Sequence, residues 1–340
     1  MHARPVAAVL AVLAAGTAGC GFLGHDSAGK QSADQTRSAP KPVPALSQQA
    51  AQDAVKSYLA GITKANAKLD LTLAAKVQTG SALQVNTAQY AVFKRNKLRY
   101  WKVRYTDALA AAPLESGYPR WFFAAATDKG AAPATRDLLV FVQQKKGAPW
   151  KVTYAPYSRT ATGPLGPGID VADNPSLVAA TDARLVVPPG KLAAVLADVV
   201  TKGSKSVFAP RIASGRFLTS SRQSLADNRK AFAGNGWSGT SRAVPAKITV
   251  YALQTKNGGA LVWFGVDFQH IYKRTGTSSG MTWKTPQYGD LHKGFGIPST
   301  IMSYVNRTER NEVVAYVPPK GAGKIVVLGN RWFPVAIVGR

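Results

Sequence analysis

Acidic residues and thiols are scarce in this chain of 340 residues. Asp and Glu together number 17 against 43 Lys and Arg, which gives a formal net charge of +26, and the one Cys is Cys20. A single thiol excludes a disulfide framework and a Cys-based zinc site. The chain also lacks any run of 18 or more apolar residues, so we expect no transmembrane helix.

Motifs that carry chemistry are equally scarce. Of the four His residues, only His270 and His292 lie in the part expected to fold, and Glu occurs only at positions 115, 309 and 312. No G-x-S-x-G, H-E-x-x-H or P-loop pattern is present. The sequence therefore assigns no catalytic residue, no metal site and no cofactor.

The N-terminus has the features of a secretory signal peptide over residues 1–19. Arg4 precedes an apolar run over 6–15, and Gly16-Thr17-Ala18-Gly19 then leads to Cys20. These small residues before Cys20 resemble the lipobox of bacterial lipoproteins, with Thr17 where that motif usually has Leu. The resemblance implies that Cys20 receives a diacylglyceryl group and becomes the mature N-terminus. The alternative is an ordinary cleaved secretory peptide.

Lipidation would fix the protein at the extracytoplasmic face of the cell membrane, since two acyl chains suffice for stable anchoring. Residues 20–46 then form the lipidated Cys and a flexible tether, because this stretch is rich in Ser, Ala, Gly and Gln and ends in Pro40-Lys41-Pro42-Val43-Pro44. Hydrophobic residues make up 46% of the chain. That share excludes a disordered polyelectrolyte and predicts folded domains beyond the tether.

The first predicted domain spans 47–157. Ser47 is the expected N-cap of a helix over 48–66, and a second helix is expected over 81–95. Strands are expected over 99–108, 118–127, 137–145 and 149–157, with a hairpin connection at 145–149. Helices followed by antiparallel strands predict an α+β domain.

A linker is expected over 158–189, and a second α+β domain over 190–340. In this domain, one helix is expected after Pro188-Pro189-Gly190, with a stop at Gly203, and a second over 221–233, ending at Gly234. Its strands are expected over 246–254, 260–273, 312–318 and 324–338, with turns at 256–259 and 319–323. The segment 274–311 shows little regular pattern. We therefore predict two tandem domains; the alternative is one α+β domain plus a β-sandwich.

Two resemblances follow from these residues. The order of elements in the first half, closing on Trp150-Lys151-Val152-Thr153-Tyr154, resembles the nuclear-transport-factor-2-like cone fold and implies two tandem cone-like domains. The lipobox-like residues 16–20, the tether and the segment 58–63 resemble actinobacterial, Streptomyces-type lipoproteins of the domain-of-unknown-function class. That resemblance implies location and architecture, and no reaction.

Two groups of residues are candidate sites. A basic cluster interleaved with aromatic residues favours polyanion binding, or else a solvated strand face: Lys94, Arg95, Lys97, Arg99, Lys102 and Arg104. Asp267, His270, Asp290 and His292 form a candidate acid–base or metal pocket. Strand alternation instead places His270 among core residues and turns Asp267 the other way.

Three functional hypotheses remain. The first is a non-catalytic binding or scaffold lipoprotein of the cell envelope, with an envelope protein as partner. The second is a module that binds an anionic wall polymer or anionic lipid, and the third is a cone-fold isomerase or hydrolase. No specific nucleic-acid partner is expected, because no recognised binding motif occurs in a chain that carries an export signal.

Overall fold

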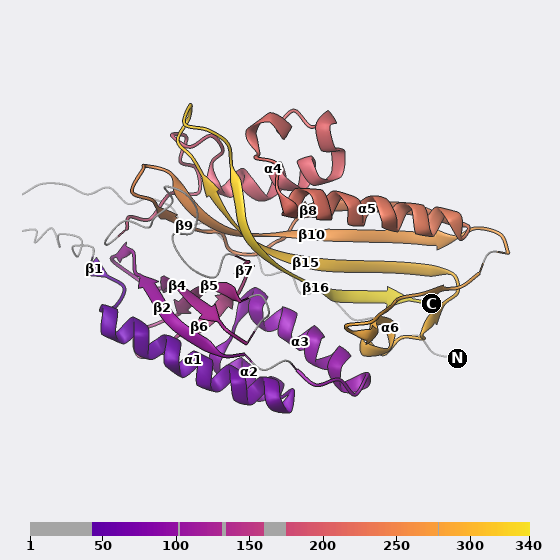
Figure 1. Ribbon diagram of the computed structural model, residues 1–340, viewed down its shortest axis with the longest axis horizontal. Coiled ribbons are helices and arrows are strands. Elements are labelled where there is room, and N and C mark those ends of the chain that lie inside the picture. The colour runs from indigo at the N-terminus through magenta and orange to yellow at the C-terminus, as the bar shows by residue number, and fades with distance from the viewer. Residues whose placement is uncertain (1–42, 101–102, 131–133, 160–174, 278) are drawn as a thin grey trace, which may run out of the picture. The chain divides into compact units, whose positions relative to one another are not determined.

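The computed structural model describes residues 43–100, 103–130, 134–159, 175–277 and 279–340. Cys20, most of the tether and Lys102 lie outside these ranges. The described residues belong to one compact unit with an α+β fold, in which helices pack on a ten-stranded antiparallel sheet (Figure 1). Within this part of the chain, no helix is both long and apolar enough to cross a bilayer.

The N-terminal half begins with helices and continues with strands. Its helices are α1 (Gln48–Lys68), α2 (Leu71–Val77) and α3 (Gly80–Arg95). Its strands are β1 (Val43–Pro44), β2 (Tyr105–Ala111), β3 (Leu114–Glu115), β4 (Arg120–Asp128), β5 (Thr135–Gln143), β6 (Lys151–Tyr154) and β7 (Tyr157–Ser158).

The C-terminal half also has helices before its long strands. Its helices are α4 (Pro189–Lys202) and α5 (Arg216–Gly234), with α6 (Leu291–Gly294) later in the chain. Its long strands are β8 (Trp237–Pro245), β9 (Tyr251–Gln254), β10 (Ala260–Arg274), β15 (Tyr304–Val317) and β16 (Val326–Gly339). Four two-residue strands lie between β10 and β15: β11 (Met281–Thr282), β12 (Lys284–Thr285), β13 (Gly289–Asp290) and β14 (Thr300–Ile301).

Helix ends follow the capping residues that the sequence offers. The Ser47 hydroxyl accepts a hydrogen bond from the Ala50 amide at 3.2 Å, and so caps α1 as predicted. Helix α4 stops at Gly203, as predicted. The φ of this residue is 65°, a positive value that glycine adopts without steric cost. Both hairpin turns predicted in the C-terminal half are confirmed, since β9 pairs with β10 and β15 with β16.

One sheet runs through both halves in the strand order β2-β4-β5-β7-β16-β15-β10-β8, with β6 also paired to β5 and β9 to β10. The junction is the short strand β7. Tyr157 in β7 is opposite Asp137 of β5 on one side and Asn330 of β16 on the other. The last strands of the two halves thus lie next to each other at the centre of the sheet.

Alternating side chains divide the core into layers. On β4, Phe122 and Ala124 pack with α1, whereas Phe123 points the other way and packs with Trp263 of β10. Trp263 also donates a hydrogen bond to the Leu138 carbonyl at 3.1 Å. The inner faces of the two half-sheets therefore enclose a shared aromatic layer, and helices cover their outer faces.

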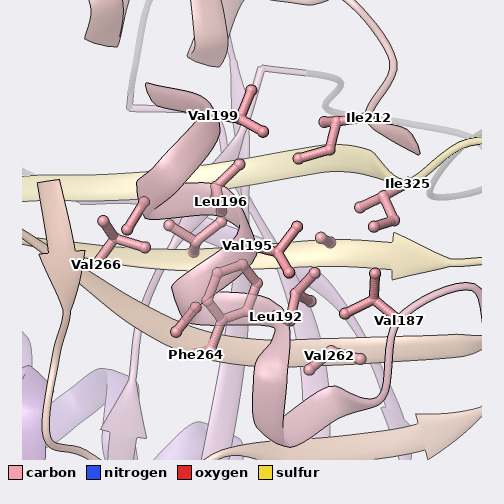
Figure 2. Close-up of a cluster of buried hydrophobic side chains, with 14 of the residues drawn as sticks. Val187, Leu192, Val195, Leu196, Val199, Ile212, Val262, Phe264, Val266 and Ile325 are labelled. Atoms are coloured by element: carbon pink, nitrogen blue, oxygen red, sulfur yellow. The ribbon is translucent and has the colours of Figure 1, made fainter. Parts of the chain in front are cut away.

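The outer face of the C-terminal half-sheet is covered by α4. Leu192, Leu196 and Val199 of this helix lie over Phe264 and its neighbours on β10 (Figure 2). Spacings of three and four residues place these side chains on one helical face, as the sequence predicted.

Three predicted strands differ from the structure. Residues 94–100 form the end of α3 and the chain after it, and β2 begins at Tyr105 rather than at 99. The strand expected over 246–254 is shorter and forms β9. The strand β8, over 237–245, was not predicted. β8 is an edge strand with a polar sequence, so it lacks the apolar alternation that marks a strand.

The start of β15 was also missed. The segment from Tyr304 to Arg310 is a central strand, although the sequence showed little pattern before residue 312. Its polar side chains are buried in an ionic network. A strand whose buried side chains are paired charges therefore shows no hydrophobic alternation in its sequence.

Candidate functional site

A cavity of about 430 Å³ lies on the helix-covered side of the N-terminal half-sheet. α1, α3, β2, β4, β5, β7 and β16 all contribute to its wall. The wall is aromatic and polar, and is lined chiefly by Tyr58, Tyr100, Tyr105, Asn86, Gln89, Asp137, Arg331 and Trp332. The volume is in the range of small-molecule sites, which combine apolar and aromatic walls with a few convergent polar groups.

Regular periodicity brings the polar residues of the N-terminal half to this wall. Asp137 shares a strand face with Leu139 and Phe141, both of which pack against the helices. Asn86 and Gln89 are three residues apart on α3 and are buried there. Each polar group therefore occupies a position where a core residue is normally expected.

Arg331 enters the cavity from β16 of the C-terminal half. Its Nη2 donates to Asn86 Oδ1 and, at 3.2 Å, to Gln89 Oε1. The Tyr100 hydroxyl donates to the same Gln89 oxygen at 2.9 Å. Within the described ranges, no carboxylate oxygen lies within 4.0 Å of the Arg331 nitrogens. The guanidinium is thus held by amides rather than neutralised by direct contact.

Acidic groups at longer range act on this guanidinium. Burial by itself lowers the Arg331 pKa, but Tyr100, Glu312, Tyr58 and Asp137 leave it above its ordinary value. Glu312 is the cross-strand neighbour of Arg331, and its carboxylate accepts from the Ala155 amide at 3.1 Å. Arg331 is therefore a cation on the cavity wall.

Asp137 and Asp128 are the acidic groups of the cavity wall, and the pKa of Asp137 is strongly shifted. Burial raises the Asp137 pKa to about 7, while a hydrogen bond from the Tyr105 hydroxyl and the charge of Arg331 oppose the rise. Burial and the neighbouring Asp137 also raise the pKa of Tyr105. Protonated and ionised Asp137 are therefore both present near neutral pH.

An ionic network lies behind Trp332. The Trp332 indole donates to Glu309 Oε2 at 2.8 Å, and Arg307 Nε lies 2.8 Å from Glu309 Oε1. His270 Nε2 is 3.3 Å from the same oxygen, and its Nδ1 is 2.7 Å from the Ser241 hydroxyl. These side chains are buried, and burial lowers the His270 pKa, so the imidazole is neutral. The network positions Trp332 on the cavity wall.

The structure does not bring the four Asp and His candidates together. Asp267 pairs with Arg310 at 2.5 Å on one face of β10, whereas His270 contacts Ser241 and Glu309 on the other. Asp290 caps α6 by accepting from the Lys293 amide, and the His292 Nδ1 lies 3.2 Å from the Ser299 carbonyl. No group of three or more His, Cys, Asp or Glu residues suited to a metal occurs in the described chain.

The basic cluster lies on the surface. Lys94 and Arg95 end α3, and Lys97, Arg99 and Arg104 follow it, all of them exposed. Lys102 and the lipidation candidate Cys20 lie outside the described residues.

Sequence analysis did not identify the cavity residues. One signal for Asp137 was available, because alternation in 135–141 places it with Leu139 and Phe141 on the core face. A second was the polar pair Asn86 and Gln89 on an otherwise apolar helix face. No sequence pattern indicates that Arg331, almost 200 residues after Asp137, lines the same cavity.

Comparison with known proteins places the chain among lipoproteins. The family model described as Domain of unknown function (DUF8094) matches residues 42–333. An "Uncharacterized lipoprotein" of Streptomyces avermitilis is 28% identical over 293 residues, which cover 83% of this chain and 82% of that protein. "Uncharacterized lipoprotein SCO6871" of Streptomyces coelicolor is 30% identical over 238 residues, 66% of this chain and 65% of that protein. No solved structure matches the chain. The expected resemblance to Streptomyces lipoproteins is confirmed.

Proposed function

The chain belongs to the family described as Domain of unknown function (DUF8094), and we propose that it is a lipid-anchored, extracytoplasmic protein of the cell envelope that binds a small polar ligand. The cavity beside Arg331 is the binding site. The observation that carries this proposal is a cavity of about 430 Å³ whose wall holds arginine and aspartate side chains, amides and aromatic rings.

The anchor is the thioether of a lipidated Cys20. Two relatives named as lipoproteins support it, as do the apolar run over 6–15 and the small residues before Cys20. Residues 21–46 would then hold the folded unit away from the headgroups.

The binding role is supported by how the wall is built. Amides and tyrosine hydroxyls are linked in a chain in which Gln78 Nε2 donates to Tyr58, and Asn86 Nδ2 donates to Gln78 Oε1 at 2.7 Å. Such a network keeps polar groups in fixed positions around an open space, and this preorganisation favours binding. A filled core would place apolar side chains at these positions.

Filling the cavity is expected to abolish ligand binding. Thr135→Trp places an indole at the cavity wall, whereas Leu109→Trp adds the same side chain at an exposed position on strand β2. Native mass spectrometry of the full chain extracted from membranes is expected to find a small molecule on the wild type and on Leu109→Trp, and none on Thr135→Trp. Equal occupancy in all three proteins, or none in any, would contradict the proposal.

We also propose that the exposed basic cluster binds an anionic wall polymer. Its described members, Lys94, Arg95, Lys97, Arg99 and Arg104, lie close together in sequence around the end of α3. Exposed charges act through a screened field, so the binding should weaken steeply with salt.

Removing the cluster is expected to abolish this polymer binding at physiological salt. The change is Gln at all six positions of the cluster, including Lys102. A matched control places Gln at six exposed basic positions elsewhere: Arg211, Arg216, Arg222, Lys230, Arg242 and Lys247. Sedimentation with purified anionic wall polymer measures the effect. Polymer binding that does not weaken with salt, or an equal loss of binding in the control, would contradict a polymer-binding role of the cluster.

The two halves of the chain are, we propose, a diverged tandem pair of cone-like units over 47–157 and 190–340, joined by a linker over 158–189. Helices precede a meander in both halves, and the strands follow in the order β2-β4-β5 in one half and β8-β10-β15-β16 in the other. Superposition of the two halves in a solved structure of a family member tests this: helices on corresponding faces support it, and helices on opposite faces contradict it.

A further inference from the structure

The donor-only chemistry of Arg331 fixes how the amides of the cavity are turned. A guanidinium has five N–H donors and no acceptor, so the atoms that Asn86 and Gln89 present to it are oxygens. The amide nitrogens of both residues must therefore point elsewhere. Asn86 Nδ2 is used by Gln78, at 2.7 Å.

The Gln89 amide is turned with its nitrogen away from Arg331. Its oxygen accepts from both Arg331 and Tyr100, while its Nε2 has no hydrogen-bond partner in the described chain. Because Gln89 lines the cavity, this nitrogen is a donor available to a ligand. The acceptor of this amide is thus used by the protein and its donors are not.

Arg331 has donors left over as well. Both of its bonds to amide oxygens use Nη2, so Nε and Nη1 remain for contact with Tyr100 and for a ligand. Arg331 is partly exposed and lines the cavity, so water or a ligand can accept from these nitrogens. The wall near Arg331 therefore offers donors and a positive charge, while the oxygens of Asn86 and Gln89 already accept hydrogen bonds.

We propose that the cavity binds the oxyanion of a small organic carboxylate or phosphate, held by Arg331 Nη1 and by Gln89 Nε2. The proposal deepens the proposed function and depends on it. A hydrogen bond from a guanidinium to a carboxylate or phosphate is charge-assisted and stronger than a bond between neutral groups, which favours an anion at Nη1. The rings of Trp332 and Tyr100 on the same wall would contact the organic body of the ligand.

Matched pairs of probes test the charge requirement without knowledge of the natural ligand. The pairs are glucuronate and glucose, glucose 6-phosphate and glucose, and benzoate and benzamide. Titration calorimetry on the detergent-solubilised full chain is expected to show an anion that binds at least about 10-fold more tightly than its neutral analogue. The carboxylate and phosphate pairs distinguish the two sources of an oxyanion.

Arg331→Gln is expected to remove this preference, so that anion and neutral analogue bind equally. Arg216→Gln is the matched control, because it removes the same charge from an exposed position at the start of α5. Arg331→Lys keeps the charge but loses the planar set of donors that bonds Asn86, Gln89 and the anion together, and is expected to bind the anion at an intermediate affinity. Circular dichroism checks that each variant is folded. If Arg331→Gln does not fold, the comparison of Arg331→Lys with the wild type tests the inference.

The state of Asp137 gives an independent readout. It shares the cavity wall with Arg331, and its charge opposes an anion. The titratable groups that interact electrostatically with Asp137 are Tyr58, Tyr100, Tyr105, Asp128 and Arg331. Since the pKa of Asp137 is raised to about 7, anion affinity should fall as pH rises from about 6 to about 8, and Asp137→Asn should remove that fall.

Two outcomes overturn the inference. If no anion binds more tightly than its neutral analogue in any of the pairs, an oxyanion site is excluded. If the preference for the anion survives Arg331→Gln, the anion binds elsewhere. The proposed function stands if membrane-isolated protein still carries a neutral ligand that Thr135→Trp loses. It fails together with the inference only if that protein carries no ligand at all.

Discussion

Glu309→Gln is expected to lower the free energy of unfolding by about 3–5 kcal/mol. The Glu309 carboxylate is buried and faces donors from three side chains, Arg307, His270 and Trp332. A glutamine has one oxygen where the carboxylate has two, so its NH2 group would face a donor. The substitution also leaves Arg307 as a buried charge without its counter-ion.

Chemical denaturation of the wild type and of Glu309→Gln measures this loss. Asp227→Asn is the control, because it neutralises an exposed carboxylate on α5 that accepts only from Gln223; a change within about 0.5 kcal/mol is expected there. Adding Arg307→Met to Glu309→Gln should recover part of the stability, because the pair is then removed together. A loss below about 1 kcal/mol from Glu309→Gln would show that the network does not hold this part of the sheet.

Cys20→Ser is expected to move almost all of the protein from the membrane fraction to the soluble fraction. Serine lacks the thiol that a diacylglyceryl group requires, and the described chain contains no helix that could span a bilayer. Cell fractionation with immunoblotting measures the shift. Thr17→Leu, which supplies the residue usual in the lipobox, should leave the protein in the membrane fraction.

A high-salt wash separates lipid anchoring from electrostatic adhesion. The chain carries a formal charge of +26, so unlipidated protein can adhere to anionic surfaces. Salt should release that adherent fraction, whereas wild-type protein should require detergent. Cys20→Ser protein that still requires detergent would contradict the lipid anchor at this position.

Local features of the fold could be predicted from local sequence. Ser47 and Gly203 mark helix ends, and the Asn257-Gly258 turn marks a hairpin, because each sets backbone geometry within a few residues. The α+β class followed from the order of these elements. The structure confirms that class with a large antiparallel sheet.

The cavity could not be predicted because it depends on contacts between distant residues. Arg331 reaches Asn86 only because the two-residue strand β7 joins β5 to β16. β7 carries no pattern of its own at that length. The start of β15 could not be predicted because Arg307 and Glu309 interrupt the apolar alternation of a strand. Their mutual pairing makes them core residues.

A crystal structure of the full chain isolated from its native membrane tests most directly whether the cavity is a binding site. We expect non-protein electron density in the space beside Arg331, with an acceptor atom within hydrogen-bond distance of its guanidinium. A cavity closed by its own lining residues, with Arg331 turned out to solvent, would contradict the binding role.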